Sequence, residues 1–299
     1  MVSCLNSDVR ENYAIYNGDA VEVLPNIPDN SIGFSIYSPP FSQLFTYSSS
    51  ERDMGNVADD AEFFKHYRHV VREKIRVTKP GRMTAVHCSD IPRTKSMHDY
   101  IGLYDFPSDI RRVHEEEGWT YCSRITVWKD PVVEMQRTKA LGLLHKQLLK
   151  DSTRSRVGMP DYVLLFRKTP EDETHSDPVG HDREKFPVDQ WQQWASPVWM
   201  DIVQTNVLNA RLAKDERDEK HICPLQLDLI ERAIRLWSNP RDTILSPFSG
   251  IGSEGYVALK CGRRFIGTEL KTTYFNTQSK FLQDAEASAA TLFDEAARG

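Results

Sequence analysis

Two short motifs, far apart in this chain, contain the residue types best suited to chemistry. The first is Ser38-Pro39-Pro40-Phe41, and the second is Ser-Pro-Phe-Ser-Gly-Ile-Gly at 246–252. Each follows a short apolar run that predicts a buried strand, at 32–37 and at 243–245. Ligands of open α/β sheets bind where the strands end. Both motifs are therefore candidates for a binding site.

The first motif suits an aromatic amine. Transfer of a methyl group to such an amine is slow because the nitrogen lone pair is delocalised into the ring. The Ser38 hydroxyl and the Pro39 carbonyl can accept hydrogen bonds from the amine and favour a tetrahedral nitrogen, while Pro40 stiffens the turn. Phe41 offers a ring for stacking, worth ~1–3 kcal/mol per base, which offsets the cost of flipping a nucleotide out of a duplex. Alone, the four residues are more typical of a proline turn after a strand, and only the presence of both motifs reverses this interpretation.

The second motif suits a cofactor that contains a nucleoside. Gly250 and Gly252 permit a tight turn and a close approach of the backbone just before a predicted helix. Glu269 ends the following strand about twenty residues later, the spacing of a carboxylate that binds ribose hydroxyls. With Gly255 the turn also fits the dinucleotide pattern G-x-G-x-x-G. A nicotinamide dehydrogenase therefore stays an alternative, although it predicts the glycine turn after the first strand and no Ser-Pro-Pro-Phe.

Hydrophobic periodicity predicts an alternating α/β chain that could position these motifs. The two strands before the motifs are joined by further predicted strands at 13–16, 82–87, 121–128, 161–167 and 264–269. Predicted helices lie at 20–24, 62–77, 108–117, 225–237 and 254–261, with an alanine-rich final helix after Phe281.

Composition narrows the class of protein. The 299 residues are 39% apolar with a net charge of −5, which supports a sizeable core and still allows a local basic face for nucleic acid. Five dispersed cysteines without metal-ligand spacing indicate reduced thiols and no metal. Neither a signal peptide nor an apolar run of ~20 residues is visible. We expect a cytoplasmic protein.

The segment 129–160 is the most basic part of the chain, with seven Lys or Arg against three acids. It is either a solvated helix face or a contact for the DNA backbone. The candidate DNA-binding residues are Arg137, Lys139, Lys146, Lys150, Arg154 and Arg156. Residues 170–190 are polar and indicate a mobile linker or loop, and Trp191, Trp194 and Trp199 predict a local core or interface, with base contact as the alternative.

Pro247 and Phe248 complete a pattern that resembles the Asp-Pro-Phe-x-Gly-x-Gly signature of DNA amino-methyltransferases that use S-adenosylmethionine (SAM). The order of the two motifs resembles the β class of the N6-adenine/N4-cytosine family. This resemblance implies a Rossmann-like, mostly parallel seven-stranded sheet flanked by helices, circularly permuted, with an inserted target-recognition region. It divides the chain into a catalytic half at 1–167, a variable region at 168–219 and a SAM-binding half at 220–299.

The resemblance also implies roles for residues. Ser38, Pro39, Pro40 and Phe41 would be catalytic. SAM would be held by Asp19 at its adenine, by the element around Pro224 at its methionine end, and by Ser246, Phe248, Gly250, Gly252, Ser253 and Glu269. The resemblance implies that the substrate is double-stranded DNA and that the target base is flipped out of the duplex. It also implies that the enzyme belongs to a restriction–modification system. Family members often form homodimers.

Three departures from the family pattern leave alternatives open. Ser246 replaces the usual Asp, and Ile222 stands where proline is expected near His221. Ser38 is typical of N4-cytosine enzymes, so we favour cytosine and keep N6-adenine as the alternative. Methylation of a protein glutamine amide and a catalytically silent DNA-binding subunit are further alternatives. The first predicts the opposite motif order, and the second is disfavoured by Ser38, Phe41 and the glycines.

Overall fold

The computed structural model describes residues 4–40, 60–93, 101–138, 140–209 and 224–296. Within these residues, one sheet has nine strands in the order β1-β2-β11-β10-β3-β4-β8-β7-β9, and β5 pairs with β6 in a separate hairpin. The candidates Phe41 and Lys139, and His221 of the element before Pro224, lie outside the described residues, as does the side chain of Arg137.

The strands of the main sheet form one continuous ladder. Their bounds are β1 (Asn6–Val9), β2 (Tyr13–Asn17), β3 (Ile32–Tyr37), β4 (Thr78–Cys88), β7 (Thr120–Val127), β8 (Asp161–Arg167), β9 (Val198–Trp199), β10 (Thr243–Ser246) and β11 (Arg264–Glu269). Neighbouring strands from β2 through β11, β10 and β3 to β4 are parallel, and β8 runs antiparallel between β4 and β7. Strands β2, β11, β10, β3, β4 and β7 therefore end at one edge, here named the carboxyl edge.

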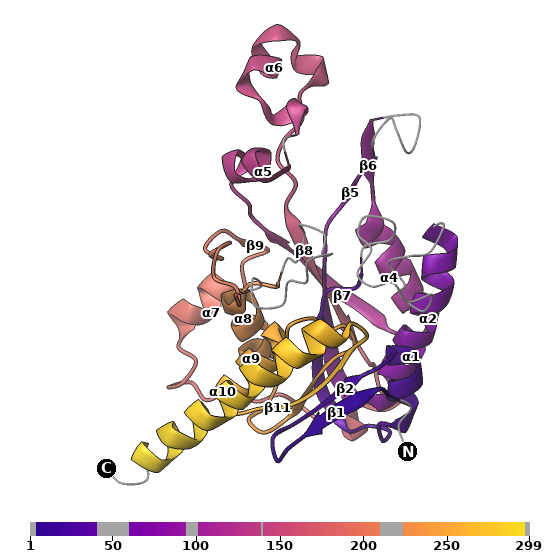
Figure 1. Cartoon of the computed structure of the whole chain (residues 1–299), viewed down its shortest axis with the longest axis vertical. Helices are drawn as coiled ribbons and strands as arrows, with labels where there is room; N and C mark the ends of the chain where they lie inside the picture. Colours follow the sequence, from indigo (N-terminus) through magenta and orange to yellow (C-terminus); the bar gives the residue numbers. More distant parts are fainter. Residues whose placement is uncertain (1–3, 41–59, 94–100, 139, 210–223, 297–299) are drawn as a thin grey trace.

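Helices cover both faces of the sheet (Figure 1). One layer consists of α1 (Ala20–Val23), α2 (Asp60–Val77) and α4 (Phe106–Glu116), whose apolar side chains share a core with β3, β4 and β8. The other consists of α8 (Leu227–Trp237), α9 (Ser253–Lys260) and α10 (Thr272–Ala296), which pack on the opposite face. A sheet buried on both faces explains why β3 is apolar or small along its whole length.

The structure confirms the predicted α/β architecture and refines it. The seven expected strands are present, and the short strands β1 and β9 extend the sheet at its two edges. The final helix begins at Thr272, not after Phe281 as the alanine content suggested. The first turns of this helix contain the buried residues Tyr274, Phe275 and Gln278. Tertiary packing, rather than helix propensity, therefore determines where the helix begins.

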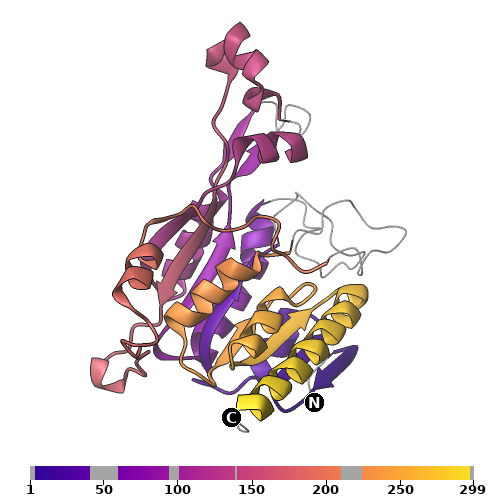
Figure 2. The ribbon, with the colours of Figure 1, turned by 90° about the vertical axis from the view of Figure 1, so that its left-hand side faces the viewer.

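Two protrusions extend beyond the carboxyl edge (Figures 1 and 2). The larger one is the arm, residues 129–160, with α5 (Pro131–Thr138), η3 (Leu141–Leu143), α6 (His145–Lys150) and η4 (Ser152–Arg154). The smaller one is the hairpin of β5 (Ile91–Arg93) and β6 (Gly102–Tyr104). Both follow strands that end at the carboxyl edge, β7 and β4, so the strand directions place them on the same side of the sheet.

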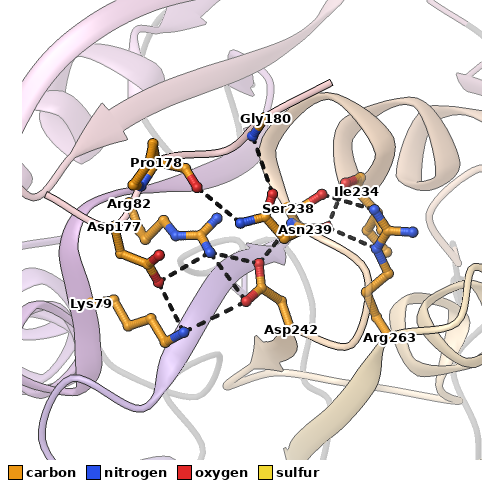
Figure 3. Close-up of polar contacts among 10 residues, drawn as sticks. All are labelled: Lys79, Arg82, Asp177, Pro178, Gly180, Ile234, Ser238, Asn239, Asp242 and Arg263. Carbon is orange, nitrogen blue, oxygen red and sulfur yellow. Dashed lines mark hydrogen bonds and ion pairs between the residues drawn. The ribbon is translucent and has the colours of Figure 1, made fainter. Parts of the chain in front are cut away.

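At the opposite edge, an ion-pair cluster joins segments that are distant in sequence (Figure 3). Arg82, only 1% exposed, lies 2.9 Å from Asp242 and 3.2 Å from Asp177, measured from Nη2 to a carboxylate oxygen of each. Lys79 pairs with the same two acids. Asn239 donates to the carbonyl of Pro178 at 2.9 Å. The polar loop at 170–190 is thus anchored at Asp177, and β4 is tied to the turn between α8 and β10.

Two further findings concern the described part of the chain. Cys4, Cys88, Cys122 and Cys261 are free thiols, as expected. None of the described helices has both the length and the apolar character needed to cross a bilayer.

Candidate active site

The two motifs meet at the carboxyl edge because their strands are neighbours. Strand β10 pairs in parallel with β3, with Ile244 opposite Phe34 and Leu245 opposite Ser35. Ser38 and the glycine turn therefore leave the sheet side by side, although more than two hundred residues separate them. The rings of Tyr37 and Phe248 lie 5.9 Å apart across this junction. The tertiary structure thus brings together the two sites that the sequence predicted separately.

Ser38 is held by a histidine from the next strand. Strand β4 pairs in parallel with β3, with Val86 opposite Tyr37, so His87 lies beside Ser38. The Ser38 hydroxyl and Nδ1 of His87 are 2.8 Å apart. Pro39 is buried, whereas Ser38 and Pro40 are half-buried and accessible. The serine oxygen is thus fixed at the rim of the site by the imidazole.

A buried carboxylate lies on the other side of that imidazole. Asp161, the first residue of β8, places Oδ2 3.2 Å from Nε2 of His87, within ion-pair range but off the straight line of a hydrogen bond. Lys129, just after β7, donates to the same carboxylate. Burial by itself would raise the pKa of Asp161, but its contacts with His87 and with the Lys129 ammonium outweigh burial and hold the pKa well below its usual value. Asp161 is therefore ionised.

Sequence reasoning missed His87 and Asp161. The hydrophobic pattern predicts His87 only as the end of a strand and Asp161 only as the start of one, and Lys129 is only part of the basic segment. The available signal was their position, because polar residues at the ends of buried strands line the ligand edge of an α/β sheet.

A buried polar layer supports the residue before Ser38. The Lys74 amine donates to the Tyr37 hydroxyl at 2.7 Å, and the hydroxyls of Tyr37 and Tyr67 are 2.7 Å apart. Burial lowers the pKa of Lys74 well below its usual value. Tyr37 is fully buried, and its fixed position limits the freedom of the adjoining Ser38.

The glycine turn has free space beside Gly250 and a close contact at Gly252. Gly250 has φ +52°, and a Cβ there would meet no atom within 4 Å, so the space beside it is free for a ligand. Gly252 has φ +93°, and a Cβ there would lie 2.7 Å from Cγ of Gln278. The amide of Gly250 donates to Oε2 of Glu269 at 2.9 Å. An accessible backbone next to a strand-end carboxylate fits the nucleoside of SAM.

The start of α9 contains a second acid that sequence reasoning missed. Glu254 is 5% exposed in the first turn of the helix, two residues after Gly252. Burial raises the pKa of Glu254 to about 8, with a smaller contribution from the charge of Glu269. Ser253 precedes it and is buried. Gly255 allows α9 to pack closely, because a Cβ there would come within 2.6 Å of the Phe265 ring.

The remaining candidates for cofactor binding lie around this turn. Asp19 caps α1 by accepting from the amide of Val21 at 2.9 Å, and the adjacent Gly18 amide donates to the carbonyl of Glu269. Ser246 is fully buried, and its hydroxyl has no hydrogen-bond partner among the described residues. Pro224 precedes α8, whose first turn faces the carboxyl edge because the helix leads into β10 at the other edge.

The DNA-binding candidates of the arm divide into two groups. Arg156 pairs with the buried Glu134 at 3.0 Å, so it holds the arm together. Lys146, Lys150 and Arg154 are exposed.

The tryptophan cluster is buried at Trp199, half-buried at Trp194 and exposed at Trp191. Trp199 is 1% exposed and stacks on Trp237 at 6.4 Å between centroids, and the guanidinium of Arg232 lies over the rings of Trp194 and Trp199. Trp191 is 55% exposed.

Comparison with known proteins agrees with this geometry. The N6/N4 methyltransferase family model, described as DNA methylase, matches residues 32–280. The Type II methyltransferase M.BglII of Bacillus subtilis is 25% identical over 283 residues, which cover 90% of this chain and 68% of that protein. The DNA adenine methyltransferase YhdJ of Escherichia coli is 27% identical over 282 residues, covering 89% of this chain and 81% of its own length.

Solved structures show the same fold. A putative DNA modification methylase from Thermus thermophilus, in complex with SAM, has a TM-score of 0.67 at 21% identity, covering 92% of this chain and 96% of that one. The cytosine-N4-specific PvuII DNA methyltransferase has a TM-score of 0.63 at 18% identity, covering 94% and 93%. Because the family model spans most of the sequence, the chain belongs to the N6/N4 DNA methylase family and is a SAM-dependent DNA methyltransferase.

Proposed function

We propose that the protein methylates the N4 amino group of cytosine at specific sites in double-stranded DNA. The observation that carries methylation of an amino group is the position of the Ser38 hydroxyl, 2.8 Å from His87 and beside the open glycine turn. A hydroxyl at this place can accept a hydrogen bond from an amino group that faces the cofactor. Serine at this position is also typical of the N4-cytosine enzymes that the sequence resembles.

The chain's own residues would bind, orient and enclose the reactants. SAM supplies an electrophilic methyl group on a positively charged sulfur. Ser38 and the carbonyl of Pro39 would accept from the two amine hydrogens and favour a tetrahedral nitrogen, while Pro40 and Phe41 would shape the pocket of the flipped base. The alignment of the two reactants removes much of the entropic barrier.

The cofactor would be held by residues around the glycine turn. Gly250 would let the backbone approach the nucleoside, and Glu269 would accept from the ribose hydroxyls. Asp19, Pro224, Ser246, Phe248, Gly252 and Ser253 complete the proposed cofactor site. Phe248 would act partly through packing, since its ring contacts Tyr37 and Tyr67.

DNA would lie against the carboxyl edge between the body and the arm. Lys146, Lys150 and Arg154 are exposed there and would contact phosphates. Arg137 and Lys139 remain proposed contacts. A homodimer remains a prediction. A DNA-modifying enzyme must work where the DNA is accessible, which agrees with the cytoplasmic location that the sequence predicts.

N6-methylation of adenine is the second candidate. The match to the adenine methyltransferase YhdJ over 89% of this chain favours it. A hydroxyl can accept from the amino group of either base, so the geometry of Ser38 fits both.

The decisive experiment identifies the product. The purified protein is incubated with SAM and unmethylated genomic DNA, the DNA is digested to nucleosides, and the nucleosides are measured by mass spectrometry. N4-methylcytosine is the expected product. N6-methyladenine would replace the proposal with its alternative, and the absence of both products, with SAM bound, would favour the silent DNA-binding subunit.

A further inference from the structure

We infer that His87 is a positioning and proton-accepting residue for Ser38, with Asp161 as the group that orients and stabilises its imidazole. This inference rests on the proposed function, because it concerns the same amino group. It follows from three contacts in a row: Ser38 to His87, His87 to Asp161, and Asp161 to Lys129.

The first step concerns the direction of the serine hydroxyl. A serine can donate or accept, unlike a carboxylate, so Ser38 alone could point its hydrogen at the amine nitrogen and block the reaction. Asp161 is ionised and can only accept, and its Oδ2 lies 3.2 Å from Nε2 of His87, so its charge favours the ring proton on Nε2 and leaves the lone pair on Nδ1. The Ser38 hydroxyl then donates to Nδ1 at 2.8 Å, and its oxygen lone pairs are left for the amine.

The second step concerns the proton that the reaction releases. The nitrogen lone pair forms the new bond to the methyl carbon, and the electron pair of the broken bond stays on the departing sulfur. The methylated nitrogen then holds one proton in excess. That proton passes to the Ser38 oxygen while the Ser38 hydroxyl proton passes to Nδ1 of His87. The serine is restored, and the imidazolium loses its proton to solvent after the product leaves.

The third step concerns the charge that appears on His87. An imidazolium beside an ionised, buried Asp161 gains an ion pair in a setting of low dielectric. Lys129 also pairs with Asp161, and this keeps the carboxylate ionised while His87 is neutral. The structure therefore already contains the counter-charge for the protonated imidazole.

Three variants test the inference in the full-length protein. His87→Ala removes the acceptor, His87→Asn keeps an acceptor near the place of Nδ1 but cannot take a proton, and Cys88→Ala is a control at the next buried residue of β4. Rates of methyl transfer are measured in a single turnover with saturating SAM and DNA. SAM affinity is measured by calorimetry, and folding by thermal denaturation.

We expect His87→Ala to slow methyl transfer about 100-fold or more, in the range of a lost general base, while SAM affinity stays within about twofold. His87→Asn should recover part of the loss, because it restores the direction of the hydroxyl. Cys88→Ala should keep the rate of the parent protein. A folded His87→Ala protein with the parent rate would overturn the inference.

A double variant separates action through Ser38 from a general structural effect. If His87 acts only through Ser38, then His87→Ala should slow the Ser38→Ala protein by less than about twofold. Independent roles predict that the two losses multiply, and this result would also overturn the inference. Failure of the proposed function shows in the parent protein, which would then form no N4-methylcytosine. Failure of the inference shows instead in the ratio of variant to parent rates, whichever amino group is methylated.

Discussion

Strand β4 carries two buried polar clusters, one toward each edge of the sheet, and their surroundings differ. Near its start, Arg82 is 1% exposed and pairs through Nη2 with Asp242 and Asp177, while its Nε and Nη1 have no hydrogen-bond partner among the described residues (Figure 3). At its end, His87 meets Ser38 and Asp161. Lys79, Asn239 and the 170–190 loop surround the first cluster with further contacts. The second cluster includes the half-buried hydroxyl of Ser38, which lies beside the open turn at Gly250.

The difference separates residues that hold distant segments together from residues that can face a ligand. The Arg82 cluster connects β4 to the turn before β10 and to the 170–190 loop, so it joins segments that are distant in sequence. Gly33 is part of this fit, because a Cβ there would lie 2.4 Å from Cγ of Asp242. The His87 cluster lies where β3 and β4 end, so it can face a substrate. We therefore expect mutations in the first to affect folding and mutations in the second to affect catalysis.

The largest expected effect is that of Ser38→Ala on chemistry. The rate of methyl transfer should fall by about 10²–10⁴-fold, because the residue loses both its acceptor and its link to His87. Single-turnover kinetics measure the rate, and calorimetry should give an unchanged SAM affinity. The matched control is Ser35→Ala on the same strand, whose buried hydroxyl has no partner among the described residues. Equal rates for the two variants would contradict a catalytic role for Ser38.

Arg82→Met should mainly reduce stability. Removal of one partner leaves Asp242 buried with an incompletely compensated charge, which costs about 3–5 kcal/mol of unfolding free energy. Urea denaturation measures this loss, and the rate per folded molecule at low temperature should be unchanged. Lys79→Met, at a side chain that is 33% exposed, should cost less than about 1 kcal/mol. A larger loss for Lys79 than for Arg82 would refute this view of the cluster.

Glu269→Gln should weaken SAM binding. Charged hydrogen bonds are worth about 1.5–3 kcal/mol, which corresponds to a roughly 10- to 100-fold increase in the dissociation constant. Isothermal calorimetry provides the measurement. Glu173→Gln, in the loop at the opposite edge, is the control and should bind SAM normally. An unaltered affinity in the Glu269 variant would remove its assignment to the ribose.

Glu254 should make the stability of the ligand-free protein depend on pH. Its pKa is raised from 4.5 to about 8 in the folded state, so between these values the folded protein holds a proton that the unfolded chain has lost. Unfolding free energy should therefore fall as pH rises through this window, by at most about 1.4 kcal/mol per pH unit. Denaturation of Glu254→Gln between pH 5 and pH 8 should give a flatter curve. Parallel curves would contradict the assignment.

The smallest effect concerns the arm. Replacement of Lys146, Lys150 and Arg154 by Ala should lower the slope of log affinity against log salt by roughly 0.9 for each phosphate that is no longer neutralised. Binding of a fluorescent duplex at several salt concentrations measures this slope. Lys280→Ala, at an exposed residue of α10, is the control and should leave it unchanged. If the arm variant keeps the slope of the parent protein, the arm does not bind phosphates.

The sequence by itself determined the α/β class, most strands and the two motifs. Strands β3, β8 and β11 have the predicted bounds, because a buried strand between turn residues is a local pattern that periodicity detects. The resemblance to the DNA amino-methyltransferases, now confirmed by the family match, depended on contiguous residues in the same way.

Only the tertiary structure decided which residues surround Ser38. His87 and Asp161 come from two other strands, and their contacts depend on strand order and register, which no local pattern contains. The same holds for Arg156, which the basic segment suggested as a DNA contact but which pairs with the buried Glu134. Charge and spacing can be read from the sequence, whereas the partner of each side chain depends on which segments the fold brings into contact.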